Sequence, residues 1–208
     1  MSFDQTQLQY IRDRLLDAFH TQASVPCLME AVSRCANVSR YRYEWASTQK
    51  RVVSATQTRV RKRKELEISR VTGDAMRKQA VRDLADSTQQ MWLLMAYSNN
   101  RVKAGEAILN MWLLNQYLAR HANQQERTIQ KLKLVIPFVS GEVLREVLGA
   151  AKVCTQLEIA RQTQINYKNW KNKWAPRYHA LRSILLELDQ NALLACEGRY
   201  RELVKKVA

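Results

Sequence analysis

Apolar residues recur at spacings of three and four along much of the chain, a pattern typical of amphipathic α-helices. In residues 4–20 the apolar positions are Leu8, Ile11, Leu15, Leu16 and Phe19. The same spacing continues at Val38, Tyr41, Trp45, Thr48, Val52 and Ala55. Valine and isoleucine do not fall in the alternating runs that half-buried strands require. The pattern therefore predicts an all-α protein.

Few residues interrupt these helical stretches. Gly73-Asp74 and Asn99-Asn100 are the candidate breaks, because glycine and asparagine favour turns. We expect one long helix over about 39–72, a second over about 73–98 and a third over 101–122. Short connections make neighbouring helices antiparallel, so the sequence predicts an elongated helical hairpin or small bundle.

The stretch Leu134–Val139 has the composition of a strand. Pro137 argues against a central strand, because proline cannot donate to a ladder. We interpret the stretch as a linker or turn into a helix over Gly141–Val153. It would divide the chain into an elongated basic helical region, residues 1–133, and a helix-turn-helix-like nucleic-acid-binding domain, residues 134–208.

Two similar apolar patches occur in the predicted helical region. Met91–Tyr97 reads MWLLMAY, and Met111–Tyr117 reads MWLLNQY. Bulky apolar faces on neighbouring helices bury each other, or bury against a second copy of the chain. An intramolecular core is the commoner outcome, and a homo-oligomer is the alternative.

Residues 155–174 are predicted to form a helix-turn-helix. A short helix would run from Gln156 to about Thr163. Asn166 would cap a second helix, because its side-chain oxygen can accept the free N–H groups of the first turn. The turn position, where the motif usually has glycine, is Gln164. The positions at which the motif buries side chains are Ile159, Ala160, Ile165 and Trp170.

The open face of the predicted second helix is polar and basic. Such a face, laid in a major groove, can donate to base edges and phosphates. Asn169 or Asn172 could read adenine, Lys168 or Lys171 could read guanine, and Arg182 would hold a phosphate. An ordinary helical hairpin with a solvated basic face is the alternative. The residues on or near this face are Tyr167, Lys168, Asn169, Lys171, Asn172, Lys173 and Arg177.

The net charge favours the nucleic-acid interpretation. The chain carries a formal charge of +15, with a net +10 in residues 34–82 and a net +5 in residues 156–208. Residues 83–155 carry only a net +2. Two basic zones around a near-neutral middle are typical of a protein that binds a polyanion. We expect that polyanion to be nucleic acid, and duplex DNA in particular. An anionic membrane or an acidic protein partner is the weaker alternative.

One cluster holds the densest positive charge. Its members are Arg59, Arg61, Lys62, Arg63 and Lys64. Bound phosphates would relieve the repulsion among these side chains, and binding would release counterions and depend on salt. The alternative is a helix face that contacts only solvent. Tyr41, Tyr43 and Trp45 lie upstream among arginines and could stack on unpaired bases, although aromatic residues are more often part of a core.

No constellation of residues supports catalysis or a cofactor. The four cysteines lack zinc-ligand spacing, and the three histidines fall on different predicted elements. There is no phosphate-cradling glycine-rich loop, no nucleophile elbow, no secretion signal and no apolar run of membrane-spanning length. We therefore expect a cytoplasmic protein of a bacterial or phage-infected cell. It would not be an enzyme and would use no metal, membrane or small-molecule substrate.

The stretch after the predicted turn also carries a family resemblance. Its matched positions are Trp170, Pro176, Tyr178, Ala180 and Leu181. In this spacing it resembles the C-terminal segment of lambdoid phage late-gene antitermination proteins of the Q type. The resemblance implies a DNA-binding factor that engages RNA polymerase near a promoter and makes it read through terminators. It also implies that Trp170, Pro176 and Tyr178 hold the second helix against the one that follows.

These observations leave three functional hypotheses. The first is a sequence-specific DNA-binding transcription regulator, of the phage antiterminator or activator type, that acts with RNA polymerase. The alternative is a non-enzymatic structural or adaptor subunit of a larger nucleoprotein, phage or secretion assembly, with the Met-Trp-Leu-Leu patches as contact surfaces. The third is non-specific binding of RNA or single strands through Tyr41, Tyr43 and Trp45.

Overall fold

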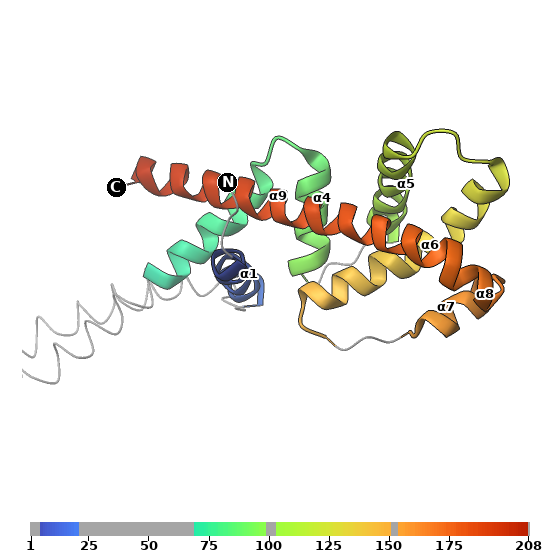
Figure 1. Ribbon diagram of the computed structural model, residues 1–208. Helices are drawn as coiled ribbons and strands as arrows, with labels where there is room; N and C mark the ends of the chain where they lie inside the picture. Colours follow the sequence, from blue (N-terminus) through green and yellow to red (C-terminus); the bar gives the residue numbers. More distant parts are fainter. Residues whose placement is uncertain (1–4, 21–68, 99–102, 151–153, 208) are drawn as a thin grey trace, which may run out of the picture.

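The computed structural model describes residues 5–20, 69–98, 103–150 and 154–207. Within these residues every regular element is a helix (Figure 1), which confirms the all-α prediction. In chain order the elements are α1 (Gln5–His20), a helix over residues 69–82, α4 (Ser87–Tyr97), α5 (Lys103–Arg120), α6 (Glu126–Val147), α7 (Gln156–Gln162), α8 (Tyr167–Asn169), the π-helix η1 (Trp170–Trp174) and α9 (Ala175–Val207). None of the described helices is both long and apolar enough to cross a bilayer.

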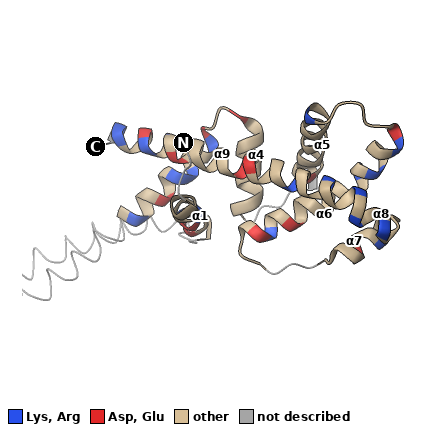
Figure 2. Ribbon diagram, viewed as in Figure 1, with Lys and Arg blue, Asp and Glu red and all other residues tan. Residues whose placement is uncertain are grey.

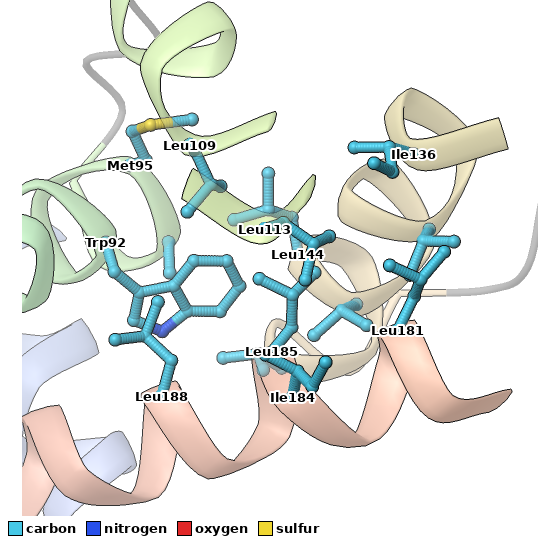
Figure 3. Packing of buried hydrophobic residues seen from close by; sticks show 14 of the residues in the cluster. Trp92, Met95, Leu109, Leu113, Ile136, Leu144, Leu181, Ile184, Leu185 and Leu188 are labelled. Atoms are coloured by element: carbon cyan, nitrogen blue, oxygen red, sulfur yellow. The ribbon is translucent and has the colours of Figure 1, made fainter. Parts of the chain in front are cut away.

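The 33-residue helix α9 is the axis around which the other helices pack. It contacts α1, α4, α5 and α6, which follow one another along its length (Figure 1). Figure 3 shows Trp92 of α4, Leu113 of α5 and Leu144 of α6 close to Leu185 and Leu188 of α9. These side chains are buried in one apolar cluster that also includes residues of the predicted helix-turn-helix. Because a buried large apolar side chain contributes about 1.5 to 3 kcal/mol, this packing fixes the helix-turn-helix to the rest of the molecule.

The two Met-Trp-Leu-Leu patches pack inside the molecule. Helices α4 and α5 contact each other, and Trp92, Leu93 and Leu113 are fully buried. The intramolecular interpretation is confirmed for these side chains. Met111 is an exception, because 66% of its surface is exposed. The adaptor hypothesis thereby loses most of the contact surface that it assigned to the patches.

The break predicted at Gly73-Asp74 is wrong, because the helix over residues 69–82 continues through both residues. One glycine costs a helix only about 1 kcal/mol, and burial of Ala80 and Val81 offsets that cost. The interruption comes instead before α4, where Asp86 accepts hydrogen bonds from two N–H groups of the first turn. The predicted turn Asn99-Asn100 lies outside the described residues, as does most of the helix predicted over 39–72.

The interpretation of Leu134–Val139 as a linker or turn is also wrong, because α6 runs through it with Pro137 inside the helix. An interior proline costs about 3 kcal/mol. A row of buried residues at helical spacing offsets the cost: Leu132, Val135, Ile136, Val139 and Val143. Helix α6 ends before the predicted Val153, in a left-handed cap at Gly149 (φ +67°). No linker therefore separates residues 1–133 from residues 134–208, and the division of function between them stays a prediction.

Candidate nucleic-acid interface

The first helix of the motif, α7, begins with a reciprocal cap. The Thr155 hydroxyl oxygen accepts a hydrogen bond from the N–H of Glu158, and the Glu158 carboxylate accepts one from the N–H of Thr155 at 2.6 Å. The hydrogen bonds that the Glu158 carboxylate accepts from the N–H and the hydroxyl of Thr155 lower the pKa of Glu158. Ile159 and Ala160 face inward and are 1% exposed. The cap was missed in the sequence, although Thr-x-x-Glu before an apolar pair is its usual signal.

The turn after α7 lies at the predicted position and has the geometry of the motif. Gln164 has a φ of +53°, in the left-handed region that favours glycine. The N–H of Gln164 donates to the carbonyl of Arg161, and the N–H of Ile165 donates to that of Ala160. This pair of hydrogen bonds forms a Schellman ending, so glutamine adopts here the backbone that glycine usually supplies. Buried Ile165 then joins the core.

The second helix begins at the predicted cap. The side-chain oxygen of Asn166 accepts a hydrogen bond from the N–H of Lys168 at 2.9 Å, and Trp170 is fully buried. After one turn, α8 widens into the π-helix η1, in which the N–H of Ala175 donates to the carbonyl of Trp170, five residues back. Pro176 follows and has no N–H to donate, so the widened turn lies where an α-helical hydrogen-bond ladder could not continue normally.

No separate third helix follows the second one. Helices α8, η1 and α9 follow one another without a gap from Tyr167 to Val207. The predicted role of Trp170, Pro176 and Tyr178 in holding one helix against the next is therefore wrong in this form. Trp170 and Tyr178 do contact each other, with ring centroids 5.8 Å apart, but they do so within one continuous helical run. The segment that would read DNA is rigidly continuous with the central helix of the fold.

The structure brings the predicted C-terminal site residues together on this run. Tyr167 is 41% exposed, and Lys168, Asn169, Lys171, Asn172 and Lys173 are exposed as well. Arg177 is half-buried, with its guanidinium carbon 5.1 Å from the centre of the Trp174 ring. The ammonium of Lys171 lies 5.1 Å from the ring centre of Tyr167. The result is a polar, cationic surface, which we call the motif face.

No described carboxylate forms an ion pair with the lysines of the motif face. Among the described residues, Lys168, Lys171 and Lys173 form no ion pair, whereas several arginines elsewhere do. Arg182, expected to hold a phosphate, pairs instead with Glu146. Lysines without carboxylate partners keep their full charge for an anionic ligand. The other predicted set, Arg59, Arg61, Lys62, Arg63 and Lys64, lies outside the described residues.

A small polar hollow adjoins α7. It has a volume of about 260 Å³ and is lined by Glu142, Cys154, Thr155, Gln156, Tyr178, His179 and Arg182. The Tyr178 hydroxyl donates a hydrogen bond to Glu142, and burial together with this carboxylate raises the pKa of Tyr178. No group of metal-ligating side chains occurs in the part of the chain that the structure describes.

Comparison with known proteins extends the resemblance far beyond the C-terminal segment. Residues 15–207 match the family "Phage antitermination protein Q". The chain is also 27% identical over 108 residues to "Antitermination protein Q" of Enterobacteria phage 82, over 51% of this chain and 47% of that protein. The chain thus spans about half the length of this curated relative. No solved structure matches.

Proposed function

The chain belongs to the phage antitermination protein Q family, and from this premise we propose that it is a sequence-specific DNA-binding transcription factor that acts with RNA polymerase as an antiterminator. In this proposal it binds duplex DNA in the host cell, recruits or modifies the polymerase there, and carries out no catalysis of its own. The relative from phage 82 is named for antitermination, which supports the biological role.

The observation that carries the DNA-binding part is the geometry of the motif face. A capped helix, a left-handed turn and a second capped helix are packed through Ile159, Ala160, Ile165 and Trp170. The exposed side chains of the second helix are Tyr167, amides and lysines, and these lysines pair with no carboxylate in the described part of the chain. Helix-turn-helix proteins place the first residues of this second helix in the major groove. The exposure of these donors on the second helix supports base reading in a major groove.

We assign the contacts by the chemistry of each side chain. Asn169 and Asn172 carry amides, which can pair in bidentate fashion with adenine, and Lys168 and Lys171 can donate to guanine. Lys173 and Arg177 would hold phosphates, which position a protein without specifying sequence. Tyr167 would pack its exposed ring against the groove wall. The cluster at residues 59–64 remains a second candidate for phosphate contacts.

The experiment is selection of binding sites from a randomised duplex library at about 0.15 M salt, where long-range attraction is largely screened. Wild type and Asn169→Ala are compared with Asn191→Ala, which removes an exposed amide from α9 away from the motif. We expect wild type and Asn191→Ala to enrich the same site, and Asn169→Ala to lose preference at one or two base pairs. Equal recovery of every duplex by the wild type would refute sequence-specific reading.

A further inference from the structure

The first half of α6 carries a pair of cations on one face that the proposed function does not use. Arg127 and Lys131 are four residues apart and so share one face of the helix. Arg127 is exposed and Lys131 is half-buried. The nearby carboxylate of Glu126 accepts a hydrogen bond from the Gln130 amide at 2.8 Å, and no ion pair joins Arg127 or Lys131 to a described carboxylate. Their charges are therefore available to an outside anion.

The path of α6 brings this pair toward the motif face. The hydroxyl of Tyr178 donates to Glu142, and the guanidinium of Arg182 pairs with Glu146. From the first contact to the second, the residue number rises by four on α6 and by four on α9. The two helices therefore run parallel where they touch. Residues that precede Glu142 therefore lead toward the end of the molecule at which η1 and α8 lie. Figure 2 shows basic segments of α6 and α8 at this same end.

The helical register places the pair on the side of α6 that faces α9. Lys131 precedes Glu142 by eleven residues, which is about three turns, so both side chains project from nearly the same side. A further contact closes the connection. Burial raises the pKa of the Tyr117 hydroxyl, and the nearby charge of Arg177 partly offsets this rise. The centroid of the Tyr117 ring lies 4.5 Å from that of His121, in the loop before α6. Tyr117 of α5 therefore lies close both to the first turn of α9 and to the loop that leads into α6.

We propose that Arg127 and Lys131 bind phosphates of the same duplex that the motif face reads, outside the stretch of groove that Asn169 and Asn172 contact. The inference rests on the proposed function. Arginines such as Arg120 and Arg182 would have to leave a carboxylate before they could bind a phosphate, whereas these two cations would not. Two added phosphate contacts would lengthen the footprint and strengthen binding without changing the base sequence that is preferred.

The test compares two variants that remove the same charge. Arg127→Gln/Lys131→Gln alters the α6 surface, and Lys205→Gln/Lys206→Gln alters exposed residues at the far end of α9. Lys133→Gln is a second control, because it changes an exposed cation on another side of α6. Fluorescence anisotropy would measure Kd for the duplex that wild type enriches, embedded in about three helical turns of DNA, at several salt concentrations between about 50 and 200 mM. Circular dichroism would check that each variant is folded.

We expect the α6 variant to bind about 10- to 30-fold more weakly at the upper end of this range, with the slope of log K against log salt reduced in magnitude by nearly 2. Its preferred base sequence should stay that of the wild type, and the controls should keep the wild-type slope. A wild-type slope in the α6 variant overturns the inference and leaves the proposed function standing. If wild type enriches no site, the proposed function fails, and the same slope comparison on a mixed-sequence duplex still decides whether these two cations hold phosphates.

Discussion

The indole N–H of Trp92 on α4 donates a hydrogen bond of 2.9 Å to the carboxylate of Asp189 on α9. Asp189 is fully buried, and its oxygens also accept hydrogen bonds from the Tyr97 hydroxyl at 3.0 Å and from the Arg12 guanidinium at 2.7 Å. Burial would lower the pKa of Arg12, but the hydrogen bond and charge of Asp189 outweigh it and raise that pKa. One carboxylate thus joins α1, α4 and α9.

Replacement of Asp189 by alanine should destabilise the protein by about 3 to 5 kcal/mol, because it leaves Arg12 without its anion and two buried donors without an acceptor. Glu187→Ala is the matched control, since Glu187 lies two residues earlier and pairs with Arg120 at an exposed site. That change should cost at most about 1 kcal/mol. Urea unfolding followed by circular dichroism would measure both free energies, and similar losses for the two variants would contradict the assignment.

Two buried tryptophans allow a second, paired prediction. Trp92 and Trp170 are both fully buried, but the indole N–H of Trp170 has no hydrogen-bond partner among the described residues. Trp92→Phe removes a donor from Asp189, whereas Trp170→Phe removes an unsatisfied donor. We expect Trp92→Phe to cost about 1 to 3 kcal/mol more than Trp170→Phe. Equal or reversed unfolding free energies would show that the N–H of Trp170 is satisfied.

Local signals explain why the helix-turn-helix could be predicted from the sequence. Asn166 caps the next helix through its own side chain. Ile159, Ala160 and Ile165 lie on α7 and the turn that directly follows it, so their spacing is a local feature of the sequence. The π-helix and the continuity of α8 with α9 were not predicted, because the family resemblance implied a separate helix after the second one.

Non-local contacts explain the other differences. The ion pair of Arg12 with Asp189 joins residues far apart in the chain, and no local sequence pattern predicts it. The stretch Leu134–Val139 was interpreted as a linker or turn, because the cost of Pro137 is visible in the sequence whereas the burial of Val135 and Val139 in a helix is not. Here tertiary packing decided the outcome against a local preference.

The capping box of α7 should make the stability of the motif depend on pH. Hydrogen bonds from Thr155 lower the folded-state pKa of Glu158 below the ordinary 4.5. The carboxylate therefore contributes stability above pH 4.5, and this contribution is lost as the pH falls through the lower, folded-state pKa. We expect Glu158→Ala to be less stable than wild type at pH 7, with a smaller difference at acid pH. Thermal unfolding at the two pH values would measure this, and a difference that does not change with pH would contradict the ionised cap.

The last prediction concerns Gln164, which has a φ of +53° although it is not a glycine. Gln164→Gly removes a left-handed strain of about 1 to 2 kcal/mol, partly offset by the greater freedom of glycine in the unfolded chain. Gln164→Val places a β-branched side chain in a region that it strongly disfavours. Unfolding free energies should therefore rank Gly above Gln and Gln above Val.

In the binding-site selection, Gln164→Gly should enrich the wild-type sequence and Gln164→Val should enrich it poorly, because the turn sets the angle at which α8 meets α7. A valine variant with wild-type stability and selection would mean that the turn is not left-handed in solution.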